Sequence, residues 1–499
     1  GLNIRGGSRV MQYYASINYN RDEGMLKTDR LNQFDVNIKN NTFSFRTNLN
    51  IDLSAGIRLL ITSSASLDKY HGPIDDVKSA YGLAFAASPV NFAATYPADE
   101  TYSWPHIRFG AVNTKTVNPY ARIHRGYTDR SRYSATTRVE YIHNLAPILK
   151  GLEVRANMSL NKTGYYHTPF STHPFMYSLA NYDFETGKHT LNSLNDENAE
   201  RTLHPESASG YQMTQVAYGA QVIHVAAWKE HQTSLTAVFN MQETTTSAAR
   251  SVLEGIPQRN MGFSMRGSYG FKDKYFAEAS FGYNGSERFD KGHQWGFFPS
   301  LGCAWIVSKE SFLADTSKWL SFLKLRFSWG QVGNDGVIDK PRFTHLPVIS
   351  ESETTDPRPN RDMGNRYYVA SYPNSKIKWE VAEQLNLGVE TKFFSGLLEL
   401  NADIYQEIRH NIIDYRITMP ATMGLEEYQL ANVGKVRSRG IDLAGKIQHA
   451  FSNDFWIILN GTFTYSKAVY KKIEEAVDKP EWQMRKNHEI SQAIGYIAE

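Results

Sequence analysis

Apolar and polar residues alternate along long stretches of this chain. In the segment YFAEASFGY, Tyr275, Ala277, Ala279, Phe281 and Tyr283 share one face of an extended backbone. The intervening residues, mostly Glu, Ser and Gly, share the other face, and a period of two residues is typical of a β-strand. The pattern predicts fifteen strands, at residues 10–20, 43–53, 57–67, 131–145, 152–164, 211–228, 232–243, 261–271, 275–284, 297–307, 322–330, 382–393, 397–408, 437–450 and 455–467.

The connections between these strands alternate between short and long. Segments such as KDK and FSG join neighbouring strands, and a long polar segment follows each short one. The long connections are residues 21–42, 68–130, 165–210, 244–260, 285–296, 331–381 and 409–436. Outer-membrane barrels have short periplasmic turns and long extracellular loops. We therefore predict an all-β fold, a transmembrane antiparallel up-and-down β-barrel.

A lipid bilayer explains why one face is apolar and the other polar. A tilted strand needs about 9–11 residues to cross the hydrocarbon layer, and only a closed barrel pairs every backbone polar group there. Aromatic residues at strand ends would form the interfacial girdles. A soluble β-sandwich or propeller is the alternative, since it explains the alternation but not the rhythm of connections. The girdle candidates are Tyr13, Tyr19, Tyr275, Tyr283, Phe298, Trp305, Trp319, Trp329, Phe393, Phe451, Phe455 and Tyr465.

Composition excludes several classes of protein. No run approaches the roughly 18 apolar residues that a membrane helix needs, so helical membrane spans are excluded. The chain carries 54 basic and 51 acidic residues, a net charge of +3, which argues against a nucleic-acid partner. Cys303 is the only cysteine, so an intrachain disulfide is impossible. Because Cys303 alternates with Leu301 and Trp305, we expect a small apolar residue of the barrel wall.

The two ends of the chain suggest a part of a longer barrel. The sequence begins at Gly1 without a signal peptide, and GLNIRGG runs straight into a strand. The final segment, SQAIGYIAE, stops as a further strand begins, and fifteen is an odd number where bacterial single-chain barrels have even numbers. We expect one barrel domain over residues 1–499 that is incomplete at both ends, with no plug domain in this chain.

Several segments resemble one known family. Residues 275–312 and 323–336 are similar to SusC/RagA-type TonB-dependent transporters of Bacteroidota outer membranes. Residues 4–26, 118–141 and 432–447 fit the same family, so the similarity runs over nearly the whole chain. It is most specific in residues 275–336, whereas the segment NVGKV…RGID is shared more widely among TonB-dependent barrels.

The resemblance implies a function for the parent protein. It implies a plugged 22-stranded barrel in the cell outer membrane, of which this chain supplies about fifteen strands. The barrel would import oligosaccharides, or as a second choice peptides, with energy that TonB delivers through a plug missing from this chain. A SusD-like lipoprotein would cover the extracellular mouth as a lid. The chain departs from the family pattern by lacking the TonB box, the plug and several C-terminal strands.

Two other classes of function stay open. One is an outer-membrane binding or adhesive barrel without active transport. The other, an enzyme, is disfavoured because G-x-S-x-G, H-E-x-x-H and Walker-type motifs are absent. His167 and His173 fit a polar loop better than a metal site. We expect no catalytic residues, no metal and no cofactor, and calcium held by irregular loop oxygens is not readable from the sequence.

Aromatic residues in the long connections are the candidates for substrate contact. Flat rings can stack on sugar faces, and nearby polar side chains such as Asp99 and Asn365 can bind hydroxyl groups. The alternative is that these residues pack the interior of the loops or contact the lid. The candidates are Tyr102, Trp104, His106, Arg108, Tyr367 and Tyr368.

Carboxylates also alternate onto the polar face of the predicted strands. They are Glu278, Glu390, Glu399 and Asp403. We expect them to line the lumen or to pack against a plug, rather than to form a proton relay.

Overall fold

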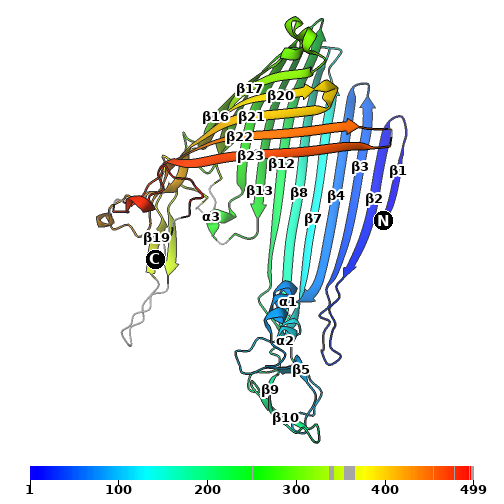
Figure 1. Cartoon of the computed structure of the whole chain (residues 1–499), viewed down its shortest axis with the longest axis vertical. Coiled ribbons are helices and arrows are strands. Elements are labelled where there is room, and N and C mark those ends of the chain that lie inside the picture. The colour runs from blue at the N-terminus through cyan, green and yellow to red at the C-terminus, as the bar shows by residue number, and fades with distance from the viewer. Residues whose placement is uncertain are drawn as a thin grey trace. The chain divides into compact units, whose positions relative to one another are not determined.

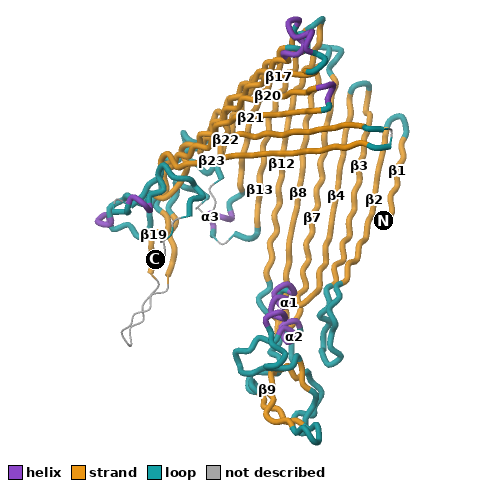
Figure 2. The backbone as a smooth tube through the Cα atoms, in the orientation of Figure 1, coloured by secondary structure: helices purple, strands orange, loops and turns teal. Residues whose placement is uncertain are grey.

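The computed structural model describes residues 1–249, 251–336, 342–352, 366–452, 454–476, 478–493 and 495. Strands dominate the described residues, as the orange segments of Figure 2 show. The chain divides into two compact units. The first comprises Gly1–Tyr141, Met158–Val216 and Thr244–Arg250, and the second comprises Ile142–Asn157, Ala217–Glu243 and Ser251–Glu499.

The first unit opens with four antiparallel strands that pair in chain order (Figure 1, blue). They are β1 (Leu2–Gly7), β2 (Met11–Glu23), β3 (Lys39–Ser54) and β4 (Ile57–Pro73). Leu2, Ile17, Phe45 and Ala65 lie directly opposite one another and form an apolar row across this sheet. One chain neighbour of each of these residues belongs to an adjacent polar row, which consists of Asn3, Ser16, Arg46 and Ser64. The alternation along the sequence thus becomes two chemically different faces.

Two long connections of the first unit carry their own small elements. Residues 74–125 contain α1 (Val77–Ala86), β5 (Thr95–Tyr96), β6 (Arg108–Gly110) and α2 (Pro119–Ile123). Residues 172–208 contain β9 (Met176–Tyr182), β10 (His189–Ser193) and β11 (His204–Pro205). The Asp76 carboxylate caps α1 by accepting hydrogen bonds from the backbone N–H groups of Lys78 and Ser79. No helix among the described residues is long and apolar enough to cross a membrane.

Four strands contain residues of both units. They are β7 (Gly126–Asn144), β8 (Leu152–Ser171), β12 (Ser209–Trp228) and β13 (His231–Thr246). All four are 16 to 20 residues long, more than the 9–11 residues that a tilted crossing requires.

The second unit contains eight further antiparallel strands, each paired with its neighbour in the chain. They are β14 (Gln258–Phe271), β15 (Tyr275–Ser286), β16 (Trp295–Ile306), β17 (Leu320–Asn334), β20 (Glu380–Phe393), β21 (Leu398–Tyr415), β22 (Leu430–Ala450) and β23 (Trp456–Lys472). The connections hold α3 (Val252–Gly255), the hairpin β18 (Val348–Ser352) and β19 (Arg366–Ser371), and 3-10 turns at Val307–Lys309, Ser311–Thr316, Phe394–Gly396, Ala421–Met423 and Glu481–Gln483.

The register of the second unit aligns apolar residues into a continuous band. One row crosses all eight strands: Tyr269, Ala277, Cys303, Phe327, Leu387, Ile404, Ile441 and Tyr465. Directly opposed residues point to the same side of a sheet, so this row is one surface. Leu387 is 54% exposed, and a wide exposed apolar face suits lipid rather than water. Cys303 lies in this row, as the sequence predicts for a small wall residue.

A polar row lies on the opposite face of the same strands. Arg326 on β17 and Asp403 on β21 form an ion pair with an Nη2–Oδ2 distance of 2.6 Å. They reach each other across Gly388 on β20, where a Cβ atom would lie only 2.6 Å from the Arg326 Nε. Arg326 also pairs with Glu390, which accepts from Lys324 as well. Glycine at position 388 therefore allows a charge network to form along this face.

Aromatic rings lie at several strand ends, whereas Tyr465 lies in the middle of β23 and Phe298 does not face lipid. Tyr275 and Trp305 stack with ring centroids 6.3 Å apart, and Trp319 stacks on Phe393 at 6.2 Å. Phe298, in contrast, is buried and meets the edge of Trp379 at 5.4 Å. The prediction for Phe298 was wrong because its side chain lies on the opposite face of β16 from those of Leu301 and Cys303.

All fifteen predicted strands are confirmed. The alternation of short and long connections is confirmed except around β16, where residues 287–294 before the strand form a shorter connection than residues 307–319 after it. The described residues form a 17-stranded sheet, and the predicted count was too low because β1, with only Leu2 and Ile4 as alternating apolar residues, and the two-residue β11 were not recognised. Several of the predicted strands were also shorter than the observed ones. β21 continues to Tyr415 and β22 begins at Leu430, because a strand that leaves the bilayer has water on both faces and loses its alternation.

Candidate binding site in the long connections

The long connections of the first unit fold into a small sheet of their own. It has the strand order β10–β9–β6–β5, and we refer to it as the loop sheet. Phe109 on β6 pairs in parallel with Met176 on β9, which joins the connection 74–125 to the connection 172–208. Within the connection 74–125, the Asn118 side chain donates to the backbone oxygens of Ala94 and Gly110, at 2.8 and 2.9 Å.

The loop sheet supports a compact cluster of aromatic side chains, which we name the Trp104 cluster. It consists of Tyr102, Trp104, His106, Phe175 and Tyr177. The Trp104 and His106 rings stack with centroids 3.4 Å apart and an interplanar angle of 19°. Phe175 meets Trp104 edge-on at 5.0 Å, and Tyr102 meets Tyr177 edge-on at 4.9 Å. Such stacked and edge-to-face arrangements are the favoured geometries of aromatic pairs.

His106 lies inside this cluster with both ring nitrogens bonded. Its Nδ1 lies 2.9 Å from the backbone oxygen of Trp104, and its Nε2 lies 2.7 Å from the Tyr177 hydroxyl oxygen. A carbonyl oxygen can only accept, so Nδ1 carries the proton and Nε2 accepts from the tyrosine O–H. Burial lowers the pKa of His106 below its ordinary value and raises the pKa of Tyr177. Both groups are therefore neutral near pH 7.

Arg108 holds the backbone that carries the cluster. Its guanidinium donates from Nε to the Tyr102 oxygen at 2.8 Å, from Nη2 to the Trp104 oxygen at 2.8 Å and from Nη1 to the His106 oxygen at 3.2 Å. Nη2 donates to the Tyr102 oxygen as well. Three carbonyl groups of one short segment thus converge on one side chain, an arrangement that the fork of five N–H donors permits.

Asp99 fixes the start of the same segment. Its carboxylate accepts from the backbone N–H of Tyr102 at 2.6 Å and from the backbone N–H of Leu191 at 2.8 Å. Burial alone would raise the pKa of Asp99, but these backbone N–H groups outweigh it and hold the pKa below its ordinary value. The carboxylate that the sequence offered for sugar hydroxyls thus accepts hydrogen bonds from the protein's own backbone. These bonds tie β10 to residues 102–106, which we name the Trp104 segment.

The four candidates of this region differ sharply in exposure. Trp104 is 39% exposed and Tyr102 is half-buried, whereas His106 and Arg108 are only 2% and 6% exposed. The structure therefore brings all four together but presents mainly the Trp104 ring to solvent. Phe175 and Tyr177 were missed in the sequence, because the parallel pairing of β6 with β9 joins segments about 70 residues apart.

Tyr367 and Tyr368 lie on β19 in the second unit. Tyr367 is exposed, and its hydroxyl donates to the Glu351 Oε1 at 3.1 Å across the β18–β19 hairpin. Tyr368 is opposite Ser350 and half-buried. Asn365, the neighbouring hydroxyl-binding candidate, lies outside the described residues. Substrate contact by these tyrosines stays a prediction.

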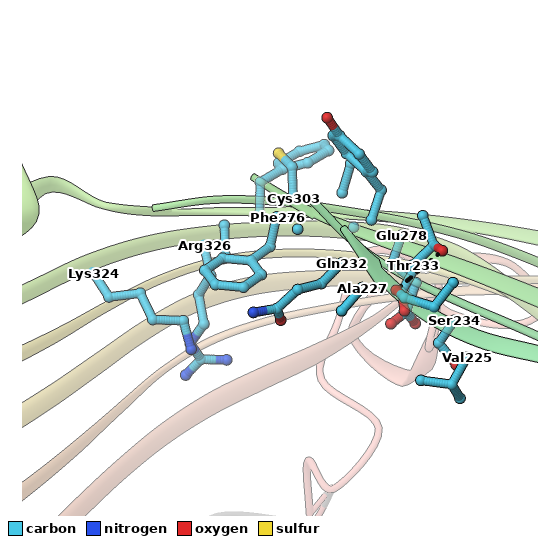
Figure 3. A pocket seen from close by; sticks show the side chains of 18 residues that line it. Val225, Ala227, Gln232, Thr233, Ser234, Phe276, Glu278, Cys303, Lys324 and Arg326 are labelled. Carbon is cyan, nitrogen blue, oxygen red and sulfur yellow. Dashed lines mark hydrogen bonds between the residues drawn. The ribbon is translucent and has the colours of Figure 1, made fainter. Parts of the chain in front are cut away.

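The polar face of the second unit has a hollow where small residues meet. Gly270, Gly302 and Ala304 contribute to its lining, beside the larger Gln232 and Phe276. Figure 3 shows Gln232, Lys324 and Arg326 on one side of the strands and Cys303 on the other. The charged groups here are already paired, Lys324 with Glu390 and Arg266 with Glu278. Within the described ranges, no group of three or more His, Cys, Asp or Glu side chains is placed to hold a metal ion.

Comparison with known proteins identifies the family. Residues 78–485 match the family described as TonB dependent receptor-like, beta-barrel. The TonB-dependent receptor SusC of Bacteroides thetaiotaomicron is 22% identical over 93% of this chain and 46% of its own length. The TonB-dependent receptor P26 of Formosa agariphila is 24% identical over 91% of this chain and 44% of its own length. The chain thus spans about half the length of these relatives.

Solved structures agree with this result at the level of the fold. The structure of the RagAB peptide transporter superposes with a TM-score of 0.66 and 17% identity, covering 97% of this chain and 53% of that one. The closed-closed state of the RagAB peptide importer superposes with a TM-score of 0.67 and 16% identity, covering 97% of this chain and 52% of that one. The predicted fold class and outer-membrane location are confirmed. The likeness to SusC supports the predicted resemblance to SusC/RagA-type receptors, and the chain belongs to the TonB-dependent receptor-like β-barrel family.

Proposed function

We propose that the receptor containing this chain imports oligosaccharides across the outer membrane with energy supplied through TonB. A SusD-like surface lipoprotein serves as its partner at the extracellular side. Membership of a family of TonB-dependent receptors supports the transport class, and the resemblance to SusC/RagA-type transporters implies the partnership. A family of this kind acts by transport rather than by chemistry on a substrate.

The observation that carries the choice of oligosaccharides is the Trp104 ring. One face of the indole stacks on His106, and Trp104 as a whole residue is still 39% exposed. A flat, immobilised aromatic surface can pack against the apolar C–H face of a sugar ring, and it loses little conformational entropy when it does so. The ring lies in a long connection supported by a sheet, where binding residues are usually found.

Peptides are the second candidate for the substrate. The support is the likeness of the fold to the RagAB peptide transporter. An exposed indole can also contact an aromatic or proline side chain of a peptide, so the Trp104 ring fits both classes. The test therefore has to include both kinds of ligand.

The first test is calorimetric binding to the intact receptor. The probes are maltohexaose, laminarihexaose, cellohexaose and a mixture of hexapeptides. We expect Trp104→Ala to weaken oligosaccharide binding roughly two- to tenfold, because an aromatic stacking contact contributes about 0.5–1.5 kcal/mol. Trp104→Phe should retain most of the affinity. Trp319→Ala serves as the matched control, because Trp319 stacks on Phe393 at a short turn, far along the chain from the long connections.

The outcomes separate the candidate functions. Unchanged affinity in Trp104→Ala would remove this residue from the site, and binding of hexapeptides alone would move the assignment to peptides. Uptake of the bound sugar by cells, and its loss when TonB is deleted, is the expected sign of import. Binding without uptake would favour the adhesive barrel instead.

A further inference from the structure

We propose that Arg108 and His106 are positioning residues that set the plane of the Trp104 ring, and that they do not touch the substrate. The inference rests on the proposed function, in which Trp104 is the contact surface. It replaces two expected substrate contacts with an internal support. The argument uses the bonding and burial of each side chain.

The donors of Arg108 point at the backbone of the Trp104 segment. Nε, Nη1 and Nη2 reach the oxygens of Tyr102, His106 and Trp104, between 2.8 and 3.2 Å. The side chain is buried, with only 6% of its surface exposed. A guanidinium that already serves three carbonyls has little capacity left for sugar hydroxyls. Its position instead fixes the direction in which the backbone presents residue 104.

His106 supports the ring itself. Its imidazole stacks on the indole with ring centroids 3.4 Å apart and an interplanar angle of 19°. Its two nitrogens form hydrogen bonds with the Trp104 backbone oxygen and with the Tyr177 hydroxyl. These two bonds fix the rotation of the imidazole about its side-chain torsions. Tyr177 is fully buried on β9. The loop sheet therefore fixes the Tyr177 hydroxyl, the hydroxyl orients the His106 imidazole, and the imidazole orients the Trp104 indole that stacks on it.

The two supports constrain different degrees of freedom. Arg108 fixes the backbone at residues 102–106, and His106 fixes the tilt of the indole. A binding surface held in this way needs no ordering when the ligand arrives, so its affinity is higher than that of a mobile ring. Lysine cannot replace Arg108, because a single ammonium cannot hold a planar fork toward three carbonyl oxygens.

The test is fluorine NMR of the intact receptor labelled with 5-fluorotryptophan. Trp104→Phe identifies the Trp104 signal among the tryptophans of the receptor, nine of which lie in this chain. We expect one narrow Trp104 signal in the unmodified protein, and a shifted or broadened signal in Arg108→Lys. Tyr177→Phe, which removes only one hydroxyl, should shift the signal less. Lys115→Gln is the matched control, because it removes an exposed cation of the same connection and should leave the signal unchanged.

Binding is measured on the same variants with the tightest of the three hexasaccharides. Arg108→Lys should lose affinity by roughly the same two- to tenfold factor as Trp104→Ala, and the double variant should lose no more than either single one. Unchanged signals from the other tryptophans show that the variant is folded. If Arg108→Lys loses affinity while the Trp104 signal stays in place, Arg108 touches the sugar and the inference is overturned.

A different result would contradict the proposed function and leave the positioning role of Arg108 intact. If the Trp104 signal moves in Arg108→Lys while affinity for the hexasaccharide stays the same, the positioning role is upheld. The substrate contact by Trp104 then fails, and with it the observation on which the oligosaccharide assignment rests.

Discussion

Trp104 and His106 are stacked neighbours with opposite exposure, and their polar atoms explain the difference. The imidazole has two nitrogens that need partners, and the fold supplies a carbonyl and a hydroxyl. A buried polar group without partners would cost about 1–3 kcal/mol, so His106 remains inside only because both bonds form. The indole is mostly hydrocarbon and can remain at the surface with one face covered.

The protonation of His106 makes the Trp104 segment sensitive to acid. Burial lowers the pKa of His106, nearby Arg108 and Arg201 lower it further, and the Trp104 carbonyl and Asp196 oppose this in part. The unfolded segment therefore takes up a proton at a higher pH than the folded one. Stability is fully present above the ordinary histidine pKa, near 6.5, and is lost as the pH falls below it.

Amide hydrogen exchange between pH 7 and pH 5 checks this sign. After correction for intrinsic rates, residues 102–108 should exchange faster at pH 5, by up to about tenfold for each pH unit below 6.5. His106→Gln, which cannot be protonated in this range, should flatten the pH dependence. An equal acceleration in His106→Gln would show that another group is responsible.

At the scale of elements, the register between the strands of the second unit determines which residues lie side by side on each face of the sheet. Each strand alone offers only a few alternating apolar residues. Pairing places Phe327, Leu387, Ile404 and Ile441 side by side, and the row becomes a continuous lipid-compatible surface. The same register places Gly388 between Arg326 and Asp403 on the other face. The pairing of the strands therefore decides both the membrane surface and the ion pairs of the wall.

A charge placed on the apolar row should destabilise the barrel. Leu387→Arg is expected to lower the free energy of unfolding by about 2–4 kcal/mol, the cost of a basic residue deep on the lipid face of a barrel. The control is Gln384→Arg, three residues earlier on the polar face, where its side chain bonds Glu407. It should cost less than about 1 kcal/mol. The measurement is the urea midpoint in lipid vesicles, and equal shifts for the two variants would contradict the assignment of faces.

At the scale of the whole molecule, the long connections of the first unit expose more apolar surface than water favours. Phe184, at the tip of the β9–β10 hairpin, is 90% exposed, and Phe85 on α1 is 77% exposed. Tyr81 meets Phe85 edge-on at 4.9 Å and is exposed as well. Tyr81 also lines an apolar groove, together with Val77, Phe92, Pro119 and Ile123. Surfaces of this kind commonly contact another protein.

We expect the partner lipoprotein to cover this surface. Tagged intact receptor, purified from native outer membranes in mild detergent, should carry a lipid-anchored protein with it. The double substitution Tyr81→Ser and Phe85→Ser should reduce the amount recovered about fivefold or more, because buried aromatic anchors each contribute at least about 1 kcal/mol to an interface.

Phe312→Ser is the control for that measurement. Phe312 is an exposed aromatic residue in the connection between β16 and β17 of the second unit, which our strand assignment expects on the periplasmic side. Equal recovery from all variants would place the partner elsewhere. Recovery of the receptor without any lipoprotein would contradict the partnership.

The strands were predictable because their signal is local. A residue such as Leu387 faces lipid because its two neighbours along the chain face the other way, and a window of ten residues is enough to show this. The missed strand β1 and the shortened ends of β21 and β22 mark where that signal stops, because there the two faces of the strand no longer meet different solvents.

The candidate site depends on contacts that no local pattern records. The sequence alone determined the alternating strands, the rhythm of connections and the gathering of aromatic residues in the segment that contains Tyr102, Trp104 and His106. Only the tertiary structure decided which of these residues are buried as supports of the ring and which are exposed to solvent. The parallel pairing of β6 with β9 delivers the Tyr177 hydroxyl to His106, and the fold turns three carbonyls toward Arg108. Burial follows from those long-range contacts, so the exposed face of Trp104 could not be read from the order of residues.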